Sequence, residues 1–417
     1  MEMRRNKLFF IMFIVAAFLC PMEPINADDA TVLPKGVFSL RLDSKFFIPI
    51  EKRFDADGNT EDLAEDLNAN LNSSVFPQLG LIEQAFGMPA GTASIGESEV
   101  SFEYNIKIFD FYFFYGLTDR LSVGVKIPYW TFKNDVDAEV DNTNATIVKN
   151  PFLGTPGDPF MGAPLVPRSI VPGALQDPLT TGDVQNLLET EFGYKPLKSW
   201  SHNGLSDIEF GGRYQYYKSD NWRLAFLGAL RAPTGRRDDP DNLVDFPFGT
   251  GTWGLLFQAN NDFIGWKNFM LNGTFVYEYY LPHKEKLRIP DDANSPITAN
   301  KERVDVKLGD IIKFEFEGRY SMTPSWIFSL FYRYTRGYKW DVDGDLGLAY
   351  DQVEKESDFK AQQYRVGITY STFPLYQAKK FPLPLTAKLY YRDRFAGENI
   401  TKSRYVGLDV AVFFSFF

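Results

Sequence analysis

Residues 406–417 read VGLDVAVFFSFF, and this last stretch of the chain decides the fold class. Chain ends are usually frayed and polar, so an aromatic end needs a place to bury its side chains. Apolar residues alternate with other residues here, which predicts a β-strand with one apolar face. An aromatic C-terminal strand is typical of proteins assembled into bacterial outer membranes. The apolar stripe consists of Val406, Leu408, Val410, Val412, Phe414 and Phe416.

The same alternation recurs along the chain, from VSFEYNIKI at residues 100–108 to LTAKLYYRD at residues 385–393. The segments between these predicted strands alternate between long and short. Outer-membrane barrels have short periplasmic turns, long external loops and an even number of strands. The sequence therefore predicts an all-β fold: an antiparallel transmembrane β-barrel of about 12 strands, with long extracellular loops and short periplasmic turns.

The N-terminus has the features of a secretory signal peptide. Arg4, Arg5 and Lys7 precede an apolar run at residues 8–19, and Ala27 offers a cleavage site. We expect residues 1–27 to be removed, and residues 28–417 to form a single barrel domain with large extracellular loops at about 51–97 and 134–202. No later segment has 18 consecutive apolar residues, which argues against helical spans. The expected location is the outer membrane of a Gram-negative-type bacterium, where lipid, lipopolysaccharide and the outer-membrane assembly machinery would be partners.

Composition argues against several other functions. The formal net charge of −10 disfavours nucleic acid as a partner. Cys20 is the one cysteine and lies in the predicted signal peptide, so no cysteine metal site is expected. The DVDGDLG segment at residues 341–347 has alternating aspartates but departs from the calcium-loop pattern. His202 and His283 are too few for a recognisable catalytic or metal set. We expect no cofactor, no metal and no enzymatic activity.

Charged residues of both signs alternate with the apolar stripes and are expected to face the barrel interior. Two interpretations remain open: a polar pathway for solutes, or ion pairs that fill and brace a small barrel. A register error of one residue would invert an assignment. The expected lumen-lining residues are Arg41, Glu103, Lys107, Lys126, Asp207, Glu209, Arg213, Arg223, Arg231, Lys313, Glu315, Glu317, Arg319, Arg333, Arg365, Lys388, Arg392 and Asp409.

Three stretches resemble a known family: YGLTDRLSVGVKIPYW, GLSDIEFGGRYQYY and LRAPTGRRDDPDN followed by FPFGTGTWGLLFQANNDF. They are similar to the outer-membrane channel family associated with meta-pathway phenol degradation, which is distantly FadL-like. The resemblance covers about residues 120–262 and implies a channel for hydrophobic aromatic compounds. Unlike FadL-type transporters, the mature chain begins almost at its first strand, which leaves no room for an N-terminal hatch.

The sequence favours an outer-membrane channel or transporter for small solutes, with hydrophobic or aromatic compounds as the expected substrates. Solutes would pass by passive diffusion through a lumen gated by the two large loops. The loop at 134–202 is rich in Pro and Gly and would either constrict the barrel, cap it or decorate the surface. In the first loop, Leu63, Leu67 and Leu71 recur at helical spacing and predict a short helix. The alternatives are a barrel for surface adhesion or recognition and an outer-membrane hydrolase.

Overall fold

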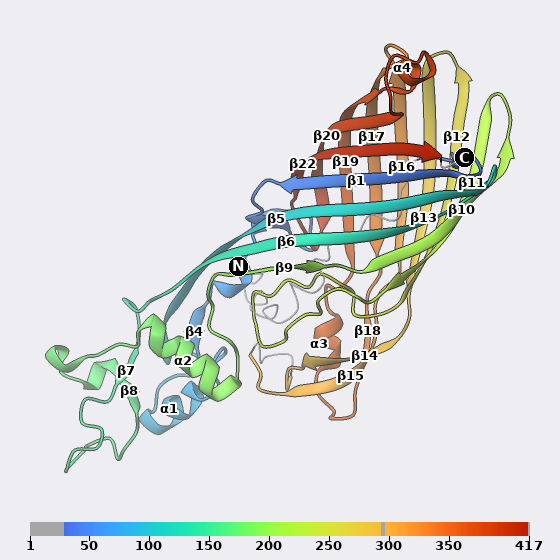
Figure 1. The fold of residues 1–417 in the computed structure, drawn as a ribbon. Helices are drawn as coiled ribbons and strands as arrows, with labels where there is room; N and C mark the ends of the chain where they lie inside the picture. The colour runs from blue at the N-terminus through green and yellow to red at the C-terminus, as the bar shows by residue number, and fades with distance from the viewer. Residues whose placement is uncertain (1–28, 293–296, 416–417) are drawn as a thin grey trace.

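The computed structural model describes residues 29–292 and 297–415, so the predicted signal peptide at 1–27 and Phe416 lie outside the described residues. Within these residues, twelve antiparallel strands close into a barrel (Figure 1). The first strand, β1, pairs with the last, β22, on one side and with β5 on the other. The strands run in the order β5, β1, β22, β20, β19, β17, β16, β13, β12, β11, β10 and β6, and β6 returns to β5.

Each barrel strand donates and accepts backbone hydrogen bonds on both sides, which removes the sheet edges that lipid cannot satisfy. Adjacent strands are antiparallel around the whole circuit. The bounds are β1 Val37–Phe47, β5 Ser94–Thr118, β6 Leu121–Asp141, β10 Ile208–Lys218, β11 Trp222–Ala232, β12 Gly254–Trp266, β13 Phe269–Tyr280, β16 Ile311–Ser321, β17 Trp326–Gly337, β19 Phe359–Ser371, β20 Leu385–Glu398 and β22 Arg404–Ser415.

The outer surface of the barrel is apolar. Large side chains such as Leu40, Phe113, Phe226 and Phe316 are exposed there, as expected for a surface that faces lipid. Pairs of aromatic rings, including Trp222 with Phe263, lie near the ends of strands at the short turns. Such aromatic residues form the interfacial girdles of membrane barrels. No helix in the described part of the chain is long and apolar enough to cross a membrane.

The connections alternate in length as predicted. Short turns join β5 to β6, β10 to β11, β12 to β13 and β16 to β17, and β19 joins β20 through the short helix α4 (Phe373–Gln377). The other end carries the long loops, whose remaining elements are β2 Lys52–Phe54, β3 Thr60–Asp62, β4 Asn70–Asn72, β7 Ile147–Lys149, β8 Leu165–Pro167, β9 Trp200–Leu205, β14 His283–Arg288, β15 Lys301–Lys307, β18 Asp341–Asp343, β21 Ile400–Thr401, α1 Leu79–Phe86, α2 Thr181–Phe192 and α3 Tyr350–Glu354.

Strands β5 and β6 extend well beyond the barrel. Two of the predicted lumen residues lie on this extension and do not face the lumen. Glu103 and Lys107 lie on the outer face of β5, on the same side as lipid-facing Phe109 and opposite buried Tyr104. The register is continuous along this stretch, with Phe109 opposite Tyr129. The outer face therefore changes from apolar to polar without turning inward. The prediction was wrong because it assumed lipid outside the whole strand, whereas water surrounds the part beyond Phe109.

The loops after β1 and β6 build an arm around this extended β5–β6 ribbon (Figure 1). Helix α2 begins with a capping box, in which Thr180 and Asp183 satisfy each other's backbone N–H groups. Asp183 also binds Lys149 at 2.8 Å, and these hydrogen bonds lower the pKa of Asp183 to about 2. The arm extends away from the barrel in Figure 1, whereas Trp200, near the end of the loop at 134–202, packs against Phe132 of β6.

The helix predicted around Leu67 is not formed. Residues 60–72 instead contain β3, a single 3-10 turn at Glu65–Leu67 and β4, and helix α1 begins later. Asn68 explains the difference, because its side chain pairs with both the N–H and the C=O of Val100 on β5. Asparagine competes with helical hydrogen bonds in this way. Leu63 and Leu71 are buried, but against the ribbon rather than on one helix face.

An apolar cluster lies at the loop end of the barrel, on the inner side of the β5–β6 ribbon. Phe246 and Phe248, from the loop between β11 and β12, pack against Phe132 and Trp130 of β6. Phe246 and Phe248 are 2% and 1% exposed, respectively, so the side chains of this cluster are as shielded from solvent as those of a protein core. A second buried cluster joins the loops after β13, β17 and β20. The mouth is therefore covered by the loop at 233–253 and its neighbours.

Candidate functional site

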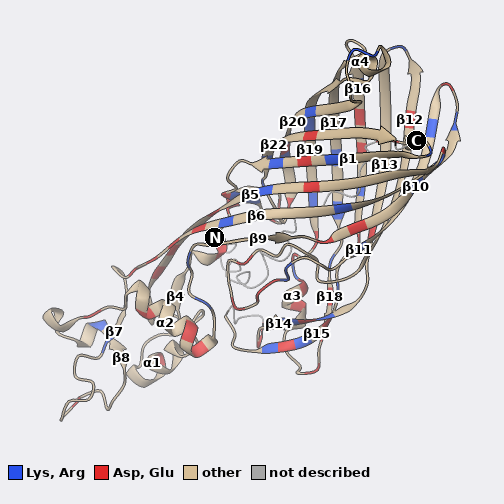
Figure 2. Ribbon diagram, in the orientation of Figure 1, with Lys and Arg blue, Asp and Glu red and all other residues tan. Residues whose placement is uncertain are grey.

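The barrel interior is the candidate site, and it is built from the inward faces of all twelve strands. Charged residues of both signs are spread along these strands in Figure 2. Apart from Glu103 and Lys107, the strand residues expected to line the lumen face inward, either buried or half-buried. They are Arg41, Lys126, Glu209, Arg213, Arg223, Arg231, Lys313, Glu315, Glu317, Arg319, Arg333, Arg365, Lys388, Arg392 and Asp409.

Asp207 is buried but has a different place from the one expected. It lies in the break between β9 and β10, and its carboxylate accepts hydrogen bonds from the backbone N–H groups of Gly235 and Thr250. The Thr250 hydroxyl donates to it as well, at 2.8 Å. Asp207 therefore holds both ends of the loop at 233–253, which carries Phe246 and Phe248 over the mouth.

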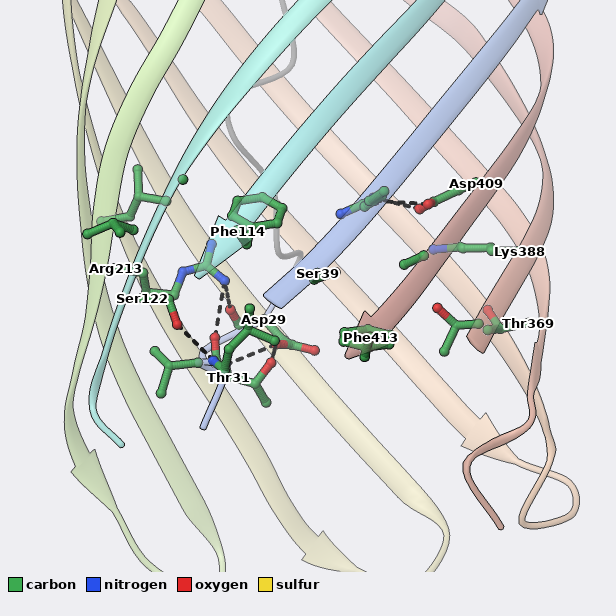
Figure 3. A pocket seen from close by; sticks show the side chains of 18 of the residues that line it. Asp29, Thr31, Ser39, Phe114, Ser122, Arg213, Thr369, Lys388, Asp409 and Phe413 are labelled. Carbon is green, nitrogen blue, oxygen red and sulfur yellow. Dashed lines mark hydrogen bonds and ion pairs between the residues drawn. The ribbon is translucent and has the colours of Figure 1, made fainter. Parts of the chain in front are cut away.

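A cavity of about 340 Å³ occupies the half of the barrel nearest the short turns (Figure 3). Apolar side chains, including Phe114, Leu227 and Phe413, line it together with charged ones. Figure 3 shows Lys388 and Asp409 on the side of the cavity opposite Arg213. Arg41 binds Asp409 at 2.6 Å across adjacent strands. The cavity thus has apolar walls, and charged side chains are fixed at its edges.

The segment before β1 enters this half of the lumen and forms part of the cavity wall. Arg213 donates to the backbone oxygen of Asp29 at 2.7 Å, and Gln215 donates to that of Ala30 at 2.7 Å. The Asp29 carboxylate binds Arg319 at 2.6 Å. Leu33 donates its N–H to Ser122 at 2.8 Å. Although no hatch was expected, residues 29–35 narrow the lumen without forming a separate domain.

A layer of buried charges crosses the middle of the barrel. Arg231 binds Glu209 at 2.8 Å and Glu278 at 2.9 Å, and Glu278 also accepts from Lys313 at 2.5 Å. The side chains of these four residues are at most 3% exposed. Their pairing agrees with the interpretation that ion pairs brace a small barrel, because charges buried this deeply need partners of opposite charge. Glu317 repeats the pattern by binding Arg319, Arg365 and Lys388.

A second, smaller cavity of about 30 Å³ lies in the half of the barrel nearest the long loops. It lies beneath the apolar cluster at the mouth, because both include Ile108 and Trp130. Next to it, three guanidinium groups surround the ring of Phe331. Those of Arg333, Arg365 and Arg392 lie 5.2, 4.4 and 5.6 Å from its centroid. Cations are attracted to an aromatic face in such an arrangement.

Several inward-facing residues escaped the sequence prediction. Asp110 was missed because the apolar stripe assigned to residues 100–108 put even-numbered positions outside, whereas Phe109 and Phe111 face lipid. Lys45 binds Asp110 at 2.6 Å. It lies four residues after Arg41 and therefore on the same face of β1, so the alternation of the sequence could have identified it. Phe331 carries an aromatic ring into the lumen, and a search for charged inward-facing residues could not identify it.

The residues considered for other chemistry do not assemble into a site. His202 is exposed on β9 and packs against Phe248, while His283 binds Glu285 at 3.1 Å. Asp341 and Asp343, from the DVDGDLG segment that departs from the calcium-loop pattern, belong to strand β18, which pairs with β15. No group of three or more His, Cys, Asp or Glu side chains able to hold a metal ion occurs within residues 29–292 and 297–415.

The fold can be compared with solved structures. An outer membrane channel from Pseudomonas putida F1 superposes with a TM-score of 0.51 at 13% identity, covering 94% of this chain and 100% of that one. A FadL homologue from Pseudomonas aeruginosa gives 0.33 at 10% identity, with 91% and 90% covered. The Ralstonia pickettii toluene transporter TbuX gives 0.33 at 9% identity, with 92% and 90% covered. No protein-family model matches the chain, and no curated protein matches it. The first superposition shows a shared barrel fold.

Proposed function

We propose that this protein is an outer-membrane channel that passes small solutes by diffusion, and that single-ring aromatic compounds fit it best. The observation that carries the proposal is the 340 Å³ cavity inside the barrel, with Phe114, Phe413 and Leu227 in its walls. An apolar cavity of about 150 Å³ is enough to bind benzene. The present cavity therefore has room for one substituted ring, and its fixed charges would contact polar substituents.

The route would run from the mouth, past the 30 Å³ cavity, to the cavity near the short turns. Gating is assigned to the loop at 233–253, because Phe246 and Phe248 cover the lumen at the level of Trp130. This assignment replaces gating by the two large loops at 51–97 and 134–202, because the arm that they build extends to one side of the barrel (Figure 1). The fold shared with the Pseudomonas putida channel supports a membrane channel but does not itself identify a solute.

Filling the cavity tests this proposal. Leu227→Trp adds a large side chain to the cavity wall, whereas Phe226→Trp places the same residue on the lipid face, where Phe226 is 46% exposed. The measurement is swelling of liposomes that contain the refolded barrel, in benzenesulfonate and in benzyltrimethylammonium, which do not cross lipid. We expect wild type and Phe226→Trp to admit at least one ring solute, and Leu227→Trp to slow that uptake several-fold. Equal uptake by all three proteins, or none by wild type, would contradict the proposal.

A second candidate, surface recognition, is favoured by one observation. The arm exposes apolar side chains at its tip, including Met161 at 96% and Leu153 at 51%. Its tip can be removed cleanly, because Lys149 and Leu165 face each other across β7 and β8. Replacing residues 150–164 by Asn-Gly would close a two-residue hairpin. Loss of cell-surface binding with unchanged solute uptake would assign recognition to the arm.

A further inference from the structure

The small cavity beneath the mouth is lined by charged and neutral polar side chains, and the charged ones already have partners. Lys45 binds Asp110 at 2.6 Å and Asp43 at 3.5 Å. Arg333 binds Glu315 at 2.5 Å. The remaining cations of the wall also have partners; they are Lys126, Arg392 and Arg394. A ligand in this cavity would therefore meet paired charges, and the neutral groups decide what it can bind.

Three neutral polar side chains in the same wall have no hydrogen-bond partner. The indole Nε1 of Trp130 is buried without an acceptor among the described residues. The carboxamide of Gln363 and the hydroxyl of Ser403 also make no hydrogen bond within residues 29–292 and 297–415. Trp130, Gln363 and Ser403 are 4%, 4% and 5% exposed, respectively. Because buried polar groups are nearly always hydrogen-bonded, three such groups around one cavity point to a ligand.

The chemistry of the three groups defines that ligand. An indole N–H can only donate, whereas a carboxamide and a hydroxyl can both donate and accept. The ligand must therefore offer an oxygen acceptor to Trp130, and a donor of its own would satisfy Gln363 or Ser403. One water molecule needs a cavity of about 10–15 Å³, so 30 Å³ admits a substituent of a few atoms but not an aromatic ring.

We propose that this cavity is a subsite for a neutral, oxygen-bearing substituent, a hydroxyl or a carboxamide, held by Trp130, Gln363 and Ser403. Trp130 also packs against Phe246 and Phe248 of the loop at 233–253, so the subsite lies directly beneath the mouth. A ring solute would place its substituent here on entry, before its ring reaches the 340 Å³ cavity. This inference rests on the proposed function and deepens it by naming the substituent that the channel favours.

The indole resonances test occupancy without transport. In a refolded barrel whose tryptophans carry nitrogen-15, the Trp130 indole signal is the one that is absent from Trp130→Phe. Benzamide should shift this signal downfield in a saturable manner, and toluene, which has the same ring but no oxygen, should not. Trp222 is 41% exposed on the outer surface, so its indole reports partition of either compound into detergent. No shift at Trp130 with benzamide, or one no larger than at Trp222, would overturn the inference.

Uptake into liposomes tests whether the subsite selects solutes. Two ring solutes of equal charge and similar size are compared, one with a carboxamide and one with an isopropyl group. The ring is N-methylpyridinium for a barrel that admits cations and benzenesulfonate for one that admits anions. We expect wild type to admit the carboxamide at least about threefold faster, because a hydrogen bond at a narrow point stabilises the solute there. The ratio should fall towards one in Trp130→Phe and in Gln363→Leu.

Trp222→Phe is the matched control, because it makes the same change on the outer surface and should keep the wild-type ratio. Heat-modifiable migration of the purified barrels checks that each variant has folded. A ratio of one in a wild-type barrel that admits ring solutes would overturn the inference and leave the channel intact. A saturable shift of Trp130 in a barrel that admits no ring solute would support the subsite and contradict the proposed function.

Discussion

At the scale of single residues, the position of a charge along the barrel axis decides what it does. Glu278 in the membrane layer binds Arg231 and Lys313 at 2.9 and 2.5 Å, and it is 2% exposed. Glu103, on the ribbon above the membrane, is half-buried on the outer face and binds Asn105. The same residue type thus braces the lumen at one height and faces water at another.

Removing the Glu278 carboxylate tests this bracing role. Glu278→Gln takes away the charge that two buried cations bind, and breaking a buried ion pair from one side costs about 3–5 kcal/mol. We expect the free energy of unfolding to fall by about 3 kcal/mol, measured by urea unfolding of the barrel in lipid vesicles. Glu99→Gln, at an exposed site, should change it by less than about 0.5 kcal/mol.

The apolar double variant separates charge from packing. Replacing Glu278 and Lys313 together by methionine removes both members of the pair and restores much of the loss in Glu278→Gln, because buried pairs exchange for apolar residues at little cost. If Glu278→Gln lowered the free energy of unfolding no more than the exposed control Glu99→Gln does, water rather than protein would compensate these charges.

Sequence reasoning at this scale succeeded where lipid lies outside and failed elsewhere. Arg231 and Glu315 lie on the buried face of their strands, opposite the apolar outer face from which the sequence pattern assigned them. Lys107 was misplaced, because alternation gives two faces but not the identity of the solvent. Phe331 and Trp130 carry no charge, so their place in the lumen required the structure.

At the scale of elements, strand pairing and loop lengths were predictable, but the course of the loops was not. The barrel strands and short turns follow from period-two patterns and turn residues. The arm does not, because its elements are held by contacts distant in sequence, such as Asn68 with Val100 and Arg288 with the backbone oxygens of Phe192 and Gly193.

The start of helix α2 gives an element-scale prediction for pH. The pKa of Asp183 is lowered from 3.8 to about 2 by hydrogen bonds from Lys149 and Thr180. A lowered pKa stabilises the folded arm above about pH 4, and this stabilisation disappears as the pH falls towards 2. Because Asp183 is about one-third exposed, we expect Asp183→Asn to cost only about 1 kcal/mol at pH 7.

Hydrogen exchange of the α2 amides measures this effect. Protection should be lower in Asp183→Asn than in wild type at pH 6–7, and the two proteins should converge near pH 2. Glu191→Gln, at the exposed far end of α2, should match wild type throughout. A difference between Asp183→Asn and wild type that persists unchanged at pH 2 would rule out the carboxylate as its cause.

The mouth gives a second element-scale prediction. Phe246→Ala with Phe248→Ala removes two rings from the cluster around Trp130 and Phe132. Since these rings cover the lumen, we expect several-fold higher single-channel conductance. Phe152→Ala with Phe160→Ala, in the arm, removes the same number of rings and should leave conductance unchanged. The reverse pattern would return the gate to the loop at 134–202.

At the scale of the whole molecule, the structure is a filled barrel rather than an open pore. Residues 29–35 narrow the turn end, ion pairs cross the middle and an apolar cluster covers the mouth. Two cavities, of about 340 and 30 Å³, lie between these layers. A molecule built in this way is expected to conduct weakly and to select its solutes, because every passage requires side chains to move.

Single-channel conductance of the refolded chain without its predicted signal peptide, residues 28–417, in a planar bilayer tests this account most directly. We expect a small, steady conductance that falls in Leu227→Trp, which narrows the larger cavity, and stays unchanged in Phe226→Trp, which faces lipid. A folded wild-type barrel that is silent in salt and admits neither ring solute into liposomes would contradict the claim that the lumen is a path.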